Sequence, residues 1–88
     1  MKIKRINDRE IDGDLFFDGK LIFENNVLIR GSLKAREVNA KKDIIVKGSY
    51  KVSLNDKVGG SQDVGGTQEV GRWQKIDGSN VAETNKGD

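Results

Sequence analysis

The chain has 88 residues, of which 34% are hydrophobic and 34% are charged, and its formal net charge at pH 7 is +2. It contains no cysteine, histidine or proline, so disulfides and thiolate metal sites are excluded and the commonest general base is absent. One small domain is expected, and its few apolar residues suit a narrow, repetitive core better than a single compact centre. No apolar run reaches membrane-spanning length and no secretory signal is present, so a cytoplasmic protein without a membrane span is expected.

Residues 1–10 are predicted to form an N-terminal arm. Apart from Met1, their only aliphatic residues are Ile3 and Ile6, whose spacing does not match the pattern that follows. The arm is therefore expected to be either an entry strand or a disordered segment.

Residues 11–57 repeat with a period of about 18 residues. The segment Val-Leu-Ile-Arg-Gly-Ser-Leu-Lys-Ala at 27–35 returns as Ile-Ile-Val-Lys-Gly-Ser-Tyr-Lys-Val at 44–52. Both copies contain the motif [Ile/Val]-x-Gly-[Asp/Ser/Thr], at Gly31 and Gly48, and the same motif occurs upstream at Gly13 and downstream at Gly66. Self-similarity at a fixed period predicts a solenoid.

Within each period, apolar residues occur in pairs two positions apart, which places both members on one face of a strand. Successive pairs lie six residues apart, except for a five-residue step between Leu33 and Val38. The residues between pairs are rich in glycine, asparagine, serine and aspartate, which favour turns. The pattern predicts an all-β fold, a three-sided parallel β-helix (β-solenoid) with hexad strands and about 18 residues per coil.

The spacing of the pairs assigns them to three walls. The predicted stacks are Leu15/Phe17 with Leu33/Ala35 and Tyr50/Val52, then Leu21/Phe23 with Val38/Ala40, and then Val27/Ile29 with Ile44/Val46. The middle residue of each hexad strand points outward, and four of these residues are apolar: Phe16, Ile22, Leu28 and Ile45. They form a candidate assembly or partner surface, unless the arm or the tail folds back over them.

Residues 58–80 form a Gly/Gln-rich hexad region. If the register continues, Gln62, Gln68 and Gln74 point inward on three walls, where buried amides must form hydrogen bonds. Alternatively, the winding ends near Leu54, and this region pairs with other chains around a shared threefold axis. The three glutamines and Trp73 are therefore candidate inter-chain contacts, with Trp73 also a candidate cap. Residues 81–88 have no pattern and are expected to form a loose tail.

No catalytic constellation is present in the sequence. Hexad β-helices also occur in acyltransferases, which need a catalytic histidine, and in one class of carbonic anhydrase, which needs histidine ligands. The protein is therefore not expected to be an enzyme, and no cofactor, metal or small-molecule substrate is expected. Nucleic acid is not an expected partner either, because the basic run 34–57 lacks interleaved aromatic residues.

The repeats in residues 11–54 resemble the bactofilin family of polymer-forming cytoskeletal proteins. The resemblance rests on Ile-Asp-Gly-Asp-Leu at 11–15 and on the two related segments that begin at Val27 and Ile44. It implies a right-handed, three-sided β-helix that polymerises end to end without nucleotide. The Gly/Gln hexads after Val58 depart from the family pattern.

Three functions are compatible with these observations. The first is a structural, self-assembling protein that forms filaments or homo-oligomers through its ends and its apolar wall, with other structural proteins as further partners. The second is a virion, phage fibre or tail component in which three chains wind together, which would place the protein in a virion. The third is an adaptor module that binds another protein without polymerising. Filaments, trimers and monomers in solution would distinguish the three.

Overall fold

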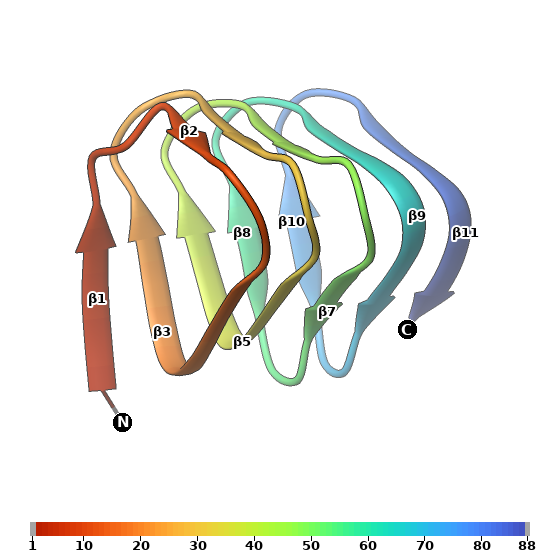
Figure 1. Ribbon diagram of the computed structural model, residues 1–88. Coiled ribbons are helices and arrows are strands. Elements are labelled where there is room, and N and C mark those ends of the chain that lie inside the picture. Colours follow the sequence, from red (N-terminus) through yellow and green to blue (C-terminus); the bar gives the residue numbers. More distant parts are fainter. Residues whose placement is uncertain (1, 88) are drawn as a thin grey trace.

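The computed structural model describes residues 2–87, with side chains described as far as residue 84. The chain winds around one axis as a stack of coils, with the two termini at opposite ends of the stack (Figure 1). Every strand pairing is parallel. The strands are β1 Lys2–Ile6, β2 Glu10–Ile11, β3 Leu15–Phe23, β4 Val27–Ile29, β5 Leu33–Ala40, β6 Ile44–Val46, β7 Tyr50–Val52, β8 Asp56–Val58, β9 Gln62–Val70, β10 Gln74–Ile76 and β11 Asn80–Gly87.

The three predicted walls are confirmed by the register of the strands. We name them the A, B and C walls. The A wall contains β7, the first part of β3 and of β5, and the last part of β9 and of β11. The B wall contains β1, β8, β10 and the second part of β3 and of β5. The C wall contains β2, β4, β6 and the first part of β9 and of β11. The chain visits them in the order B, C, A.

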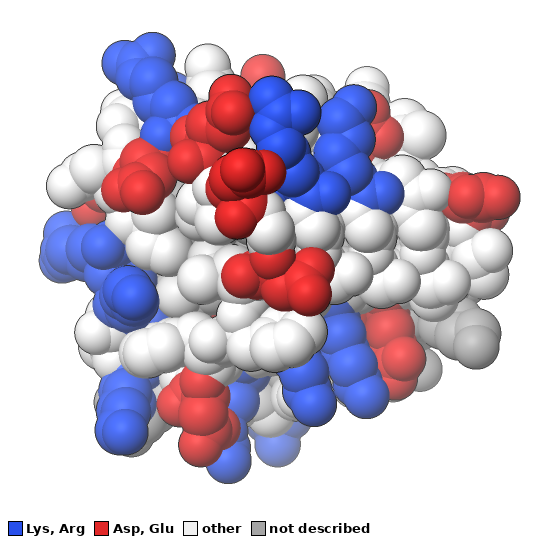
Figure 2. Space-filling model, in the orientation of Figure 1, with Lys and Arg blue, Asp and Glu red and all other residues white. Residues whose placement is uncertain are grey.

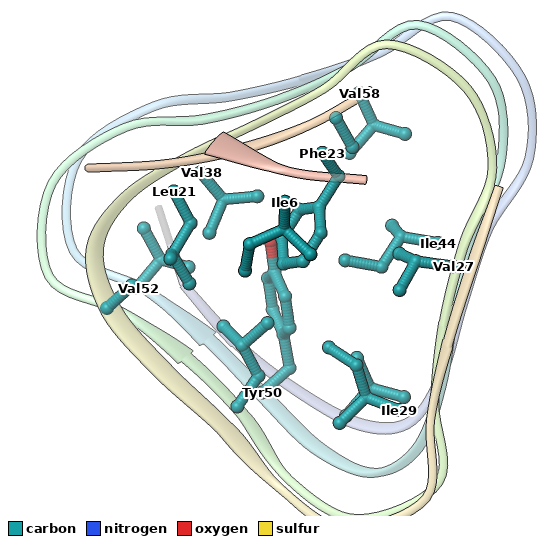
Figure 3. Close-up of a cluster of buried hydrophobic side chains, with 14 of the residues drawn as sticks. Ile6, Leu21, Phe23, Val27, Ile29, Val38, Ile44, Tyr50, Val52 and Val58 are labelled. Carbon is teal, nitrogen blue, oxygen red and sulfur yellow. The ribbon is translucent and has the colours of Figure 1, made fainter. Parts of the chain in front are cut away.

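The inward pairs form the core of the prism, whose cross-section is triangular (Figure 3). Leu21, Phe23, Ile29 and Ile44 are each 0% exposed, and burying a side chain of this kind contributes about 1.5–3 kcal/mol. The register places large rings on small residues, because Phe17 pairs with Ala35 and Phe23 with Ala40. This pairing keeps the core filled without widening the coil.

Small polar side chains connect successive coils at the corners. The backbone N–H of Ser32 donates to Asp14 Oδ1 over 2.7 Å, and that of Ser49 donates to Ser32 Oγ over 3.0 Å. Each side chain thus satisfies an N–H of the coil that follows it. The corner between the B and C walls has the same arrangement, formed by Asn26, Asp43, Ser61 and Ser79.

The corner that contains Asp14 also requires glycine at two positions. Gly13 has a φ of 112°, a conformation that L-residues with a side chain rarely adopt. A Cβ on Gly31 would lie 2.1 Å from Asp14 Oδ1, so a larger residue there would displace the carboxylate from its bond to Ser32.

The structure gives both termini more order than their composition suggested. β1 pairs with the second half of β3, so the N-terminal arm is an entry strand over residues 2–6. The expected loose tail instead forms β11, which pairs with β9 over residues 80–87, while Asp88 lies outside the described residues. Backbone pairing needs no apolar side chains, which explains why the pattern of residue types did not reveal this strand.

The Gly/Gln hexads continue the winding of the same chain. β9 pairs with β6 and β7, and β10 pairs with β8. The alternative in which the winding ends near Leu54 therefore does not describe this structure. Over residues 2–87, no helix is long and apolar enough to cross a membrane.

Candidate functional site

The N-terminal end of the prism presents three open strand edges, one on each wall, of which the first part of β3, residues 15–17, pairs only with β5. β1 pairs only with β3, and β2 pairs only with β4. Three inward apolar residues of this first coil, Ile11, Leu15 and Phe17, are only half-buried, and exposed Lys4 occupies the inward position that pairs with Leu21. Unpaired backbone groups next to uncovered apolar residues are a site for pairing with another chain.

The C-terminal end is also open, and its inward residues alternate between polar Gln74 and Asn80 and apolar Ile76 and Ala82. β10 pairs only with β8, and β11 pairs only with β9. Gln74 is half-buried and Asn80 is exposed, and Asn80 Nδ2 donates to Gln74 Oε1 over 3.1 Å. The two ends therefore differ in chemistry, although both leave strand edges unpaired.

A chain of polar side chains winds through the core toward this end. Its members occupy the first inward position of successive hexads: Tyr50, Asp56, Gln62, Gln68, Gln74 and Asn80. Three hydrogen bonds connect neighbours six residues apart, between Tyr50 and Asp56, between Gln62 and Gln68, and between Gln74 and Asn80. Another connects stacked coils, from Gln74 Nε2 to Asp56 Oδ2 over 2.8 Å. The first inward position of each hexad thus changes from apolar to polar along the axis, while the second remains apolar, with Val58, Val64 and Val70 buried.

Asp56 is the one ionisable carboxyl group inside the core of the described residues. It is 0% exposed, and Tyr50 donates its hydroxyl to Asp56 Oδ1 over 2.7 Å. Burial raises the pKa of the Asp56 carboxyl, while the hydrogen bonds from Tyr50, Gln74 and Gln62 act in the opposite direction. Burial and the neighbouring Asp56 raise the pKa of Tyr50 well above its ordinary value, so Tyr50 remains a donor at neutral pH.

Gln62 and Gln68 lie in the interior of a single chain, 1% and 0% exposed. Gln62 Nε2 donates to Gln68 Oε1. Gln62 Oε1 and Gln68 Nε2 have no partner among the described atoms. The predicted inward orientation of all three glutamines is therefore observed, but with contacts inside one chain.

The four outward apolar residues do not form one surface. Phe16 is 64% exposed on the A wall and Ile45 is 37% exposed on the C wall, whereas Ile22 and Leu28 are half-buried. Leu28 and Ile45 pair directly in the register of β4 and β6, as expected. They line a hollow of about 280 Å³, and neither terminal strand covers it.

Trp73 lies on the corner between the A and B walls and is 49% exposed. Its carbonyl oxygen accepts the N–H of Asp56 over 3.0 Å, so its backbone is fixed by the coil before it. The Trp73 side chain lies on the side of the prism and is thus a candidate contact with another chain.

Charged side chains pair mainly from one coil to the next. Glu24 accepts from both Arg5 and Lys41, at 3.1 and 3.0 Å, and the Lys41 hydrogen bond is the first cause that lowers the pKa of Glu24. In the same way, Arg36 lowers the pKa of Asp18. On the face of the molecule drawn in Figure 2, the part formed by the glycine-rich strand β9 carries fewer charged groups than the rest.

Comparisons with known proteins identify no relative. No family model, curated protein or solved structure matches the chain. Within residues 2–87, no group of three or more Asp and Glu side chains is placed to hold a metal ion. The unpaired strand edges and the exposed apolar residues make the open ends and the outer walls the candidate site.

The sequence analysis did not select Asp56 as a site residue. The signal was present, because Asp56 stands at the inward position six residues before Gln62. The hydrogen bonds from Tyr50 and Gln74 explain how the carboxyl group is accommodated there.

Proposed function

We propose that this protein is a structural, self-assembling protein that associates with further copies of itself through the open ends of its β-helix. The observation that carries the proposal is that four strands, β1, β2, β10 and β11, each pair on one side only. No helix or loop of the described residues covers these edges. Native proteins usually cover such edges or place charge on them to limit association; β1 carries Lys2, Lys4 and Arg5, but its backbone edge is not covered.

The N-terminal edge is the better defined of the two. Ile6 O accepts the N–H of Glu24 over 3.0 Å, so the backbone groups of Ile6 point toward β3. Successive residues of a strand point their backbone groups to alternate sides, and the N–H of Arg5 therefore faces the free edge. Half-buried Ile11, Leu15 and Phe17 supply apolar area beside it.

The experiment compares the wild type with Arg5→Pro and Arg5→Ala. Proline removes the free-edge donor and blocks close approach of another strand, while the bonds from β1 to β3 remain. Both variants lose the exposed ion pair of Arg5 with Glu24, so Arg5→Ala is the matched control. Light-scattering mass after size exclusion, with negative-stain images, is expected to show assemblies for the wild type and Arg5→Ala, and small species for Arg5→Pro.

The outcome also distinguishes the ways in which ends can join. Monomers of Arg5→Pro indicate that an N-terminal end joins a C-terminal end, and dimers indicate that like ends join. A wild type that remains monomeric at every concentration contradicts the proposal and favours the adaptor alternative. A discrete wild-type trimer favours a fibre component instead.

The exposed wall provides a second test of assembly. Leu28→Glu with Ile45→Glu places charge on the C wall, where Ile45 is exposed and Leu28 is half-buried. We expect the fold to survive and lateral contacts of this wall to be lost. Unfolding of the double variant would show that the wall is buried by the chain itself.

A further inference from the structure

One coil of the prism turns its corner one residue early. Along the A-to-B corner, Phe17 pairs with Ala35 and Lys20 with Glu37, so Arg36 alone takes the place of two residues. Figure 1 shows the corner of β5 set back from the corners on either side of it. The missing residue leaves a hollow of about 710 Å³ between the coils of β3 and β7, which we call the notch.

The notch has an apolar floor and a basic rim. Phe16 is 64% exposed within it, and Phe17 and Leu54 are half-buried beside it. On the rim, Arg36 is paired with Asp18 over 2.5 Å, whereas Lys34 is exposed and forms no ion pair within the described chain. The chemistry that fits is an aromatic group with a carboxylate at its side.

The same chain exposes such a group two coils further along. The register of the A wall runs from Lys34 through Lys51 to Glu69, so Glu69 occupies the same outward position as Lys34. The A-to-B corners of these coils also stack in register, because Leu54 N–H donates to Arg36 O and Arg72 N–H donates to Leu54 O. Trp73 is therefore placed relative to Glu69 much as the notch is placed relative to Lys34.

We propose that two copies of this chain pair side by side through their A walls, with Trp73 of each copy in the notch of the other. A twofold axis along the strand direction at the level of β7 reverses the order of the coils but keeps the order of positions along each coil. It therefore brings Glu69 of one copy to Lys34 of the other at the same time, and each contact forms twice. This lateral contact does not depend on stacking through the ends.

The pairing is weak and depends on salt. The 26 × 25 Å outline of the molecule covers about 650 Å², less than the ~800 Å² per partner of a standard interface. Lys51 lies at the level of the axis, so the Lys51 side chains of the two copies face each other. Removing this repulsion with Lys51→Gln strengthens the dimer, because like charges across an interface oppose association.

The test is a charge exchange followed by sedimentation velocity and by the emission of Trp73, the only tryptophan of the chain. The charge variants are made in Arg5→Pro, whose N-terminal edge is blocked, and in this parent the mass rises from monomer to dimer with concentration while the emission shifts to shorter wavelength. Lys34→Glu and Glu69→Lys each weaken dimerisation at least about tenfold, and the double variant restores it. Lys57→Glu, at the equivalent outward position of the B wall, is the matched control and leaves dimerisation unchanged.

Two results overturn the proposal: a double variant that does not recover, or a Lys57→Glu variant that weakens association as much as Lys34→Glu does. Phe16→Ser provides an independent check, since it removes the floor of the notch without changing charge and is expected to weaken the dimer. Circular dichroism melting confirms that each variant folds. End stacking does not involve Lys34, so filaments that survive a failed charge exchange overturn the lateral contact and leave the proposed function standing.

Discussion

Tyr50→Phe removes a single hydroxyl group from the centre of the core and retains the ring that spans it (Figure 3). The hydroxyl donates to Asp56 Oδ1 over 2.7 Å, and both residues are 0% exposed, so no water replaces the donor. A hydrogen bond to a charged acceptor contributes about 1.5–3 kcal/mol. We expect the free energy of unfolding at neutral pH to fall by this amount, and the melting temperature by roughly 10 °C.

The loss depends on pH in a defined direction. Burial raises the pKa of Asp56 in the folded state above the ordinary 3.8, so the folded state binds more protons than the unfolded state between the two values. Stability therefore falls as pH rises through the folded pKa. The Tyr50 hydroxyl opposes this effect by stabilising the carboxylate, and the variant loses more stability above the folded pKa than below it. With Asp56 protonated, the loss is about 0.5–1.5 kcal/mol.

Urea unfolding of the wild type and Tyr50→Phe, at neutral pH and below pH 3.8, measures both values. Acidic groups far from the substitution, such as Asp18 and Glu24, titrate equally in the two proteins, so their effects cancel in the difference. Equal stability at neutral pH would show that the Tyr50–Asp56 bond is absent. A deficit that is the same at both pH values would show that the carboxylate is not the acceptor.

Three further predictions concern the core and one corner. Asp56→Asn keeps an acceptor for the tyrosine hydroxyl and removes the buried charge; urea unfolding should show greater stability than the wild type at neutral pH, and lower stability would mean that the ionised form is favoured. Gln68→Leu leaves the Nε2 donor of Gln62 unpaired and is expected to cost about 1–3 kcal/mol, whereas Gln62→Leu with Gln68→Leu should cost less. A double variant less stable than the single one would contradict this pairing. Gly31→Ala places a Cβ against Asp14 Oδ1 and should lower the melting temperature, by roughly 4–8 °C for each kcal/mol lost; an unchanged melting temperature would show that the corner relaxes freely.

The walls were predictable from the sequence because each inward pair is set by a two-residue spacing. Leu15, Leu33 and Tyr50 align in the register as expected, and the five-residue step before Val38 appears as the early corner of β5. The hexad pattern also predicted that Gln62 and Gln68 face inward. These features follow from strand geometry, which depends on residue positions more than on residue types.

Other features depend on contacts between coils that no local pattern encodes. The hydroxyl bond that accommodates Asp56 comes from Tyr50, which the sequence analysis treated only as an apolar core residue. The notch requires the lengths of adjacent corners to be compared in three dimensions. The half-burial of Leu28, compared with the exposure of Ile45, likewise reflects the neighbours of each coil and not the residue itself.

The corner side chains described above also have a consequence for how the chain folds. Asp14 accepts an N–H from Ser32, and Ser32 accepts one from Ser49, so each coil positions the backbone of the coil that follows it. A chain synthesised from its N-terminus therefore grows in the same direction in which its coils stack, and a completed coil acts as the template for the next. An inserted copy of one whole coil should accordingly be accepted as an added layer, lengthening the prism by about 4.8 Å.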